Sequence, residues 1–465
     1  MGKASGFDDL SAEHLIHCHQ SGLLCITYLC NLMLLTGYVP AQFGTGVTHP
    51  IPKSNVGNKN LNFDDFRGIT ISPVISKILE KGILENFGQY FKSSESQFGF
   101  KKKIGCNHAI YTLKSIVELF NLRDSTVNLC SLDISKAFDK LNHFALFLKL
   151  MLNNVPVNVI LLLFTWYQCS VAFVKWNGQC SSLYRLLAGV RQGGVLSPIL
   201  FAMLVDSLIK RIMKSNLGCH IGLLCISILM YADDLILVSA SACDLQKMID
   251  LCISELSNLD LQVNIKKSQC IRIGKHFNHC CSNLYINNVE ISWSKNLTYL
   301  GIMINSSTHF SIDMKRTRGK FYRSFNAVYS KISLSNESLI VSLVKTCCVP
   351  ALIYSLESIN MNASSLNSLD EPLYNAMGKI FKTFDRVVLR QCMFYMNVLP
   401  LSKEYFCRKI KFLSKLNASG NFLLKQLFLT FGQSDLDSIC AKHKIDNVFN
   451  ARSTIWETFV NSLYL

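Results

Sequence analysis

Three aspartates stand where strands are predicted to end, and together they could act on phosphate groups. Asp133 closes the β-rich segment VNLCSLD, and Asp233 and Asp234 lie between two runs rich in Ile, Leu and Val. The second pattern predicts a hairpin with both carboxylates at its tip. Three such carboxylates could hold two divalent ions about 3.5 to 4 Å apart, the arrangement used for in-line phosphoryl displacement. Mg²⁺ suits this set because it prefers oxygen ligands and shares substrate phosphates, and Mn²⁺ can substitute.

An Asp-Asp pair is also a common turn sequence, so the neighbouring segments carry much of the interpretation. In GVRQGGVLSPILF a Gly-rich turn leads into an apolar helix, with Pro198 near its first turn. Gly193 and Gly194 would let a bulky ligand approach the backbone, and the alternative is an ordinary turn before a core helix. The chain around Asp133 is predicted to begin as a strand and to become helical after Ser135.

The rest of the chain supplies the elements that must position these residues. Residues 1–40 are predicted to be helical with Ser11 as N-cap, and the following GTGVTHPIPKSNVGNKNLN to be a loop rich in turn residues. Helices are expected in ISKILEKGILENF and HAIYTLKSIVELF, then short strands alternating with helices to about residue 305, then mainly helix. This order predicts a mixed α/β (α+β) core with helical additions at both ends.

Composition limits the partners and the compartment. Lys and Arg total 47 against 31 Asp and Glu, a net charge of +16 that favours nucleic acid or an anionic membrane surface. The 19 cysteines, in a long chain without a signal peptide, are interpreted as reduced intracellular thiols. Histidines and cysteines cluster at 14–19, 276–281 and 440–443, but no pair of CxxC half-sites completes a zinc set.

Two apolar runs resemble membrane spans, and both have better interpretations. Residues 23–39 contain Asn31 and end at Gly37 and Pro40, so a buried helix is predicted. Residues 221–240 carry Asp233 and Asp234 at their centre, where hydrocarbon would penalise two charges, so buried strands are predicted. No membrane is therefore expected as a partner.

Taken together, the segments resemble the reverse transcriptases of non-LTR (LINE-type) retrotransposons, in wording and in order, over roughly residues 1–355. The matching blocks are KASGFDDLSAEHL, PIPK, FRGITISPVISKILEKGI, SQFGFKKKIGC, SLDISKAFD, GVRQGGVLSPILF, YADD, LDLQVNIKKSQC and YLGIMIN. The resemblance implies a right-hand polymerase fold with fingers, palm and thumb. The domains that follow are a helical leader (1–45), fingers and palm (46–305), a helical thumb-like region (306–400) and a helical basic C-terminal extension (401–465).

The implied function is RNA-directed DNA polymerase, with two Mg²⁺ ions assisting transfer from a dNTP to a primer 3′ hydroxyl on an RNA template. The expected partners are an RNA template, a DNA primer, dNTPs and element RNA in a ribonucleoprotein particle, inside the cell in the nucleus or the cytoplasm. The alternatives are a catalytically silent remnant that only binds nucleic acid and an intron-maturase-like reverse transcriptase. Because no upstream endonuclease domain is visible, a truncated element or a partial gene model is expected.

The resemblance also assigns roles to single residues. It makes Asp133, Asp233 and Asp234 the metal ligands and Lys267 the lysine that assists the leaving pyrophosphate. The residues expected at the nucleotide are Arg67, Phe138, which excludes a 2′ hydroxyl, Gln192 and Gly193. Those expected at the template and primer are Lys53, Tyr299, Leu300 and Gly301. Two positions depart from the family pattern, Gly68 where proline is usual and Lys101 where arginine is usual.

Overall fold

The chain forms two compact units in this computed structural model, which describes residues 2, 4–53, 61–191, 193–222, 224–332 and 336–463. The first unit comprises Met1–Phe100, Leu132–Ser215 and Met248–Lys267. The second comprises Lys101–Ser131, Asn216–Lys247 and Ser268–Leu465. Each unit therefore draws on segments far apart in the sequence.

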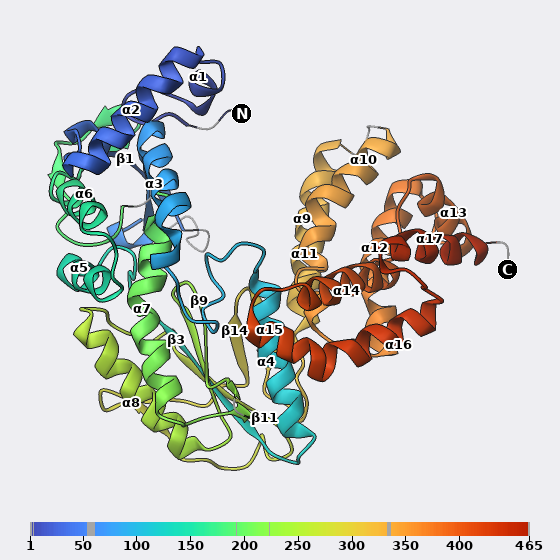
Figure 1. Cartoon of the computed structure of the whole chain (residues 1–465). Coiled ribbons are helices and arrows are strands. Elements are labelled where there is room, and N and C mark those ends of the chain that lie inside the picture. The colour runs from blue at the N-terminus through green and yellow to red at the C-terminus, as the bar shows by residue number, and fades with distance from the viewer. Residues whose placement is uncertain are drawn as a thin grey trace. The chain divides into compact units, whose positions relative to one another are not determined.

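The first unit is built on a five-stranded sheet with helices around it (Figure 1). Its strands are β1 (Thr45–Pro52), β2 (Phe66–Ile71), β4 (Val171–Trp176), β5 (Gln179–Cys180) and β6 (Tyr184–Arg185). The strand order is β2-β1-β4-β5, with β6 also pairing with β4. Its helices are α1 (Ala12–Ile16), α2 (Gln20–Thr36), α3 (Val74–Phe87), α5 (His143–Leu152), α6 (Val157–Gln168) and α7 (Ser197–Lys214).

Strand β1 corrects the predicted loop at residues 44–62, of which 54–60 lie outside the described residues. β1 is antiparallel to β2 along its length and parallel to β4 only from Thr45 to Thr48. Pro50 and Pro52 therefore fall where one side of the strand is unpaired, the position that proline tolerates. Glycines and prolines that resemble a loop in sequence are held in a strand by partners on other segments.

Helix α2 also differs from its prediction. Only Met33 is buried, whereas Leu24, Tyr28 and Leu35 are exposed, so the apolar run at 23–39 is a surface helix and not a buried one. Ser11 does stand at the N-cap position of α1, as predicted.

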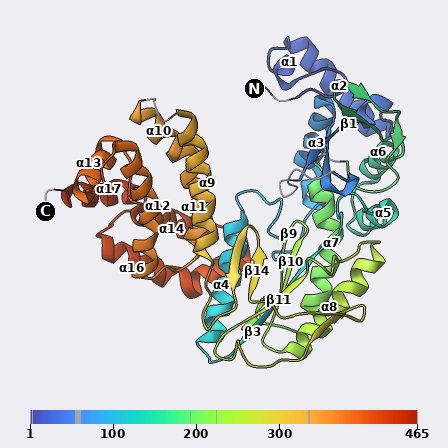
Figure 2. The same ribbon diagram turned by 180° about the vertical axis from the view of Figure 1, so that it is seen from behind.

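The second unit contains a four-stranded sheet in the order β11-β3-β10-β9 (Figure 2). Its strands are β3 (Val127–Asp133, whose last two residues are assigned to the first unit), β9 (Ile228–Tyr231), β10 (Asp234–Ser239) and β11 (Gln269–Ile273). Helix α4 (Cys106–Asn121) packs against β9. The central strand β10 is buried from Leu235 to Ser239, which explains its continuous apolar run and confirms the predicted buried strands. Helix α8 (Ala242–Asn258) follows β10.

Small hairpins and a helical assembly complete the second unit. The hairpin strands are β7 (His220–Ile221), β8 (Leu224–Cys225), β12 (Leu284–Ile286), β13 (Val289–Ile291), β14 (Asn296–Tyr299) and β15 (Ile302–Asn305). The helices are α9 (Met314–Ile332), α10 (Glu337–Leu343), α11 (Val349–Leu352), α12 (Ala363–Phe381), α13 (Arg386–Tyr395), α14 (Leu401–Asn417), α15 (Phe422–Leu427), α16 (Gln433–His443) and α17 (Ala451–Asn461). Helix thus dominates beyond residue 305, as predicted.

Among the described residues, one helical stretch, Glu337–Ser358, is long and apolar enough to cross a membrane by length and composition alone. Half of its most apolar window is buried in the second unit, and core helices meet the same criteria. All 19 cysteines are free thiols.

Candidate active site

The hairpin β9–β10 presents the paired carboxylates. Tyr231 and Asp234 form its last cross-strand pair, so Ala232 and Asp233 make the two-residue turn. Ala232 has φ +60°, in the left-handed region that residues other than glycine rarely adopt. Asp233 is half-buried and Asp234 is exposed. The predicted hairpin with acidic residues at its tip is confirmed.

The direction of β3 within its sheet follows from one side-chain contact with β10. The side-chain amide of Asn128, near the start of β3, donates a hydrogen bond of 3.2 Å to the carbonyl of Ser239, the last residue of β10. These neighbouring strands therefore run antiparallel. β3 ends at Asp133, and β10 begins at Asp234.

Asp133 and Lys267, whose roles were predicted from two separate segments of the sequence, lie close to each other. Lys267 Nζ is 3.4 Å from Asp133 Oδ2, and 68% of the lysine side chain is exposed. The Asn264 amide donates to the Asp133 carbonyl at 2.7 Å, and the Ser135 amide donates to the Gln262 carbonyl at 2.8 Å. These backbone bonds fix the segment that carries Lys267 beside the end of β3.

Phe138 lies in a turn that backbone hydrogen bonds attach to the Gly-rich loop. The chain after Ser135 forms turns and becomes helical only at His143, so the helix predicted there is wrong. The Val190 amide donates to the Phe138 carbonyl at 2.8 Å. The Phe138 ring is half-exposed and lies 4.6 Å from the ring of Phe201, in α7.

Gly193 lies directly against strand β2. It has φ +81°, and a Cβ there would come within 2.2 Å of the Thr70 carbonyl oxygen. Glycine is therefore required at this position by the protein's own backbone. Arg67 lies on the same strand with its side chain exposed, and Gln192 is outside the described residues.

A buried ion pair lies behind this loop, and no sequence pattern predicted it. Arg191 Nη1 lies 3.1 Å from Glu80 Oε1, and the other nitrogen of the guanidinium, Nη2, donates to the Phe43 carbonyl at 2.7 Å. The other oxygen of Glu80 accepts from the Val195 amide, at the approach to α7. Glu80 lies on the buried face of the amphipathic α3, and this position could have indicated a buried ionic partner. The partner, however, is 111 residues away in the chain.

The residues expected at template and primer are divided between the units. Lys53 directly follows β1 with its side chain exposed, and its amide donates to the Asp65 carbonyl at 2.8 Å. Tyr299 belongs to the second unit, where burial raises the pKa of its phenol and the Asp234 carboxylate adds to the rise. Leu300 and Gly301 form the tight turn between β14 and β15, both with positive φ. The Leu300 carbonyl accepts from the Tyr354 hydroxyl at 3.2 Å.

The donors available to a metal are carboxylate oxygens. Among the described residues, no group of three or more His, Cys, Asp or Glu side chains is gathered closely enough to hold an ion. Asp133, Asp233 and Asp234 nevertheless fit a hard divalent cation by donor type, and none of them is fully buried.

Comparison with known proteins gives a family match over residues 51–304, to the reverse transcriptase (RNA-dependent DNA polymerase) model. The Pol polyprotein of the type-2 retrotransposable element R2DM of Drosophila melanogaster is 26% identical over 53% of this chain and 23% of its own length. The RNA-directed DNA polymerase from mobile element jockey of Drosophila funebris is 25% identical over 76% of this chain and 39% of its own. The chain thus spans about a quarter to two fifths of the length of these relatives.

Among solved structures, apo telomerase from Candida tropicalis is similar over 94% of this chain and 74% of its own, with 15% identity and a TM-score of 0.45.

Proposed function

Since the chain belongs to the reverse transcriptase (RNA-dependent DNA polymerase) family, we propose that it extends a DNA primer on an RNA template by nucleotidyl transfer from dNTPs. One observation carries the proposal: β3 and β10 are antiparallel neighbours, and the aspartates of the SLD and YADD segments lie where β3 ends and β10 begins. Asp133, Asp233 and Asp234 are the carboxylates that we propose take part in the transfer.

The family uses divalent metal ions, and the proposed ions here are two Mg²⁺ held by Asp133, Asp233 and Asp234. When bound, they would activate the primer 3′ hydroxyl and neutralise charge on the triphosphate. Lys267 contributes a cation that can move from Asp133 to the departing pyrophosphate, because its side chain is largely exposed. Arg67, also exposed, would bind the triphosphate of the incoming nucleotide.

The remaining predicted residues would position the substrates. The half-exposed ring of Phe138 would pack on the sugar and exclude a 2′ hydroxyl, while Gly193 would lie beside the nucleotide and template. Lys53 would contact template phosphates, and the Tyr299–Gly301 turn would hold the primer end. The net charge of +16 supports phosphate binding, which should weaken steeply with salt.

The element's own RNA, in a ribonucleoprotein particle, is the proposed template. The proposed compartment is the nucleus or the cytoplasm.

The test is primer extension by the full chain with an RNA template, a DNA primer, dNTPs and Mg²⁺. The double variant Asp233→Ala, Asp234→Ala should lose extension yet still bind the template-primer duplex in a filter assay. Asp446→Ala, which removes an exposed carboxylate in the second unit, is the matched control and should retain extension. Tight duplex binding without extension by the wild-type chain would instead identify a silent nucleic-acid-binding remnant.

A further inference from the structure

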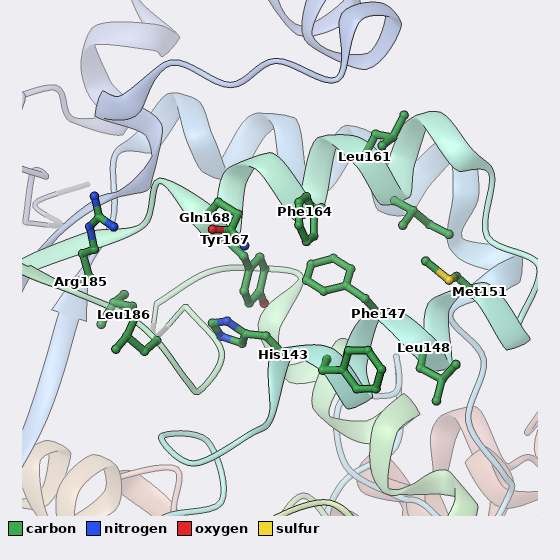
Figure 3. A pocket seen from close by; sticks show the side chains of 13 residues that line it. His143, Phe147, Leu148, Met151, Leu161, Phe164, Tyr167, Gln168, Arg185 and Leu186 are labelled. Atoms are coloured by element: carbon green, nitrogen blue, oxygen red, sulfur yellow. The ribbon is translucent and has the colours of Figure 1, made fainter.

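An apolar groove of about 660 Å³ runs between α5 and α6 in the first unit (Figure 3). Helix α5 lines it with Phe147, Leu148 and Met151, and α6 faces them with Phe164 and other apolar residues. Arg185 lies at one end of the groove, and Met151 lies at the other. The groove plays no part in the proposed chemistry.

Aromatic packing gives this groove a preformed floor. The ring of Phe147 meets those of Phe164 and Tyr167 edge-on, with centroids 5.4 and 5.8 Å away. The His143 ring is perpendicular to that of Tyr167 at 4.8 Å, and its Nε2 is hydrogen-bonded to the Gly189 carbonyl at 2.7 Å. Rings fixed on several sides do not need to rearrange before a ligand binds.

The rim of the groove exposes large apolar side chains. Phe144 is 78% exposed and Leu187 is 82% exposed. At the end of α2, Gly37 lies against Leu161, and the neighbouring Tyr38 is also exposed, so the apolar surface continues beyond the groove. Contiguous exposed apolar surface of this kind marks interaction sites.

Charge around the groove is one-sided. Of the 13 residues that line it, Arg185 is the permanent cation, and none is Asp or Glu. The whole chain carries +16. The complementary ligand is therefore apolar along its length and negatively charged where it reaches Arg185.

We propose that this groove binds an amphipathic helix of a partner protein, with its apolar face in the groove and its acidic residues beside Arg185. Phe144, Leu148 and Met151 follow helical spacing on α5, and Leu161, Phe164 and Gln168 follow it on α6. Two such ridges form a trough into which the ridge of a third helix packs.

The same observations disfavour other occupants. Nucleic acid is bound through several phosphate contacts, whereas a single arginine lines the groove. The rings of Phe147 and Tyr167 are buried, so a flat bilayer at the rim would leave them uncontacted. A second copy of the chain would bring together two strongly basic proteins.

The test uses a fluorescent synthetic peptide of about five helical turns, with Leu at helical spacing and Glu at one end, titrated into the full chain by anisotropy. Phe144→Glu should weaken binding at least tenfold, and Phe449→Glu should not change it. Phe449 is the matched control because it is a 95% exposed phenylalanine of the second unit. Arg185→Glu should weaken the Glu peptide several-fold and favour a peptide that carries Lys in place of Glu.

Three results would overturn the proposal. The first is no saturable binding of the Glu peptide, or equal binding of a peptide with the same residues scrambled off one face. The second is concentration-dependent self-association in sedimentation velocity that Phe144→Glu abolishes, which would identify a second copy as the occupant. The third is binding to anionic vesicles that Phe144→Glu abolishes, which would identify a membrane. Because none of these assays measures nucleotide transfer, they are independent of the polymerase proposal.

Discussion

The Arg191 guanidinium lies 3.1 Å from the Glu80 carboxylate, and both side chains are buried. Arg191 also stacks on Trp166, with its Cζ 4.1 Å from the ring centroid. Glu80 in turn accepts hydrogen bonds from the amides of Val195 and Leu196. The pair thereby fixes both ends of the loop that carries Gly193.

Breaking this pair should destabilise the first unit and displace the loop. Glu80→Ala leaves a buried, unpaired guanidinium, and the expected loss in the free energy of unfolding is about 3 to 5 kcal/mol in urea denaturation. Glu85→Ala on the same helix removes an exposed pair with Lys81 and should cost less than about 0.5 kcal/mol.

A role in positioning the loop requires a second measurement, made with Glu80→Gln. This variant should raise the KM for dNTP more than it weakens template-primer binding. Equal changes in both would show a merely structural role.

Lys267 should act on the rate of transfer more than on binding. Lys267→Ala removes the cation proposed to assist the leaving pyrophosphate, so kcat in steady-state extension should fall about a hundredfold with little change in KM. Lys267→Arg should recover part of the rate because it restores a positive charge. Lys266→Ala, at the exposed neighbouring lysine, is the control, and a comparable fall there would argue for a general loss of charge.

Phe138 should determine the choice of sugar. Phe138→Ala opens space beside the nucleotide, so preference for dNTP over rNTP, measured as the ratio of kcat/KM values, should fall about tenfold to a hundredfold. The ring also packs on Phe201, so a stability measurement is needed beside it. Unchanged sugar preference with reduced stability would make Phe138 a packing residue only.

His443 should make the second unit acid-sensitive. Burial lowers the pKa of His443 to about 4, and repulsion from Lys403 and Lys442 adds to the effect. An unfolded histidine titrates near 6.5, so between these values the unfolded state binds a proton that the native state excludes. The free energy of unfolding should therefore fall by about 1 to 3 kcal/mol as the pH drops from 6.5 to 4.

A pH series of urea denaturation measures this loss. His443→Leu should flatten the dependence, whereas His309→Leu at an exposed site should leave it unchanged. A dependence that survives in His443→Leu would assign the acid sensitivity to other groups.

Local patterns predicted the elements whose periodicity is set by their own residues. The hairpin around Asp233, the strand that ends at Asp133 and the helix after Pro198 all carry apolar runs bounded by turn residues, and each is present. The pairing of Asp133 with Lys267 depends on backbone bonds across the fold, so no spacing in the sequence indicates it.

The wrong predictions share a physical cause, because each depended on distant partners. Glycines and prolines of β1 form a strand because β2 and β4 hydrogen-bond to them. The turn after Ser135 replaces a helix where Lys136 takes a positive φ and the Gly189–Val190 backbone binds the chain. The apolar composition of α2 gave no indication that its apolar side chains remain exposed to solvent.

The left-handed backbone conformation of Ala232 limits which residues can replace it in this hairpin. A left-handed residue other than glycine costs roughly 1 to 2 kcal/mol, which the β9–β10 ladder offsets. Glycine or asparagine would relieve that strain, whereas valine or isoleucine would increase it next to Asp233. The backbone conformation alone therefore favours small or turn-forming residues at position 232.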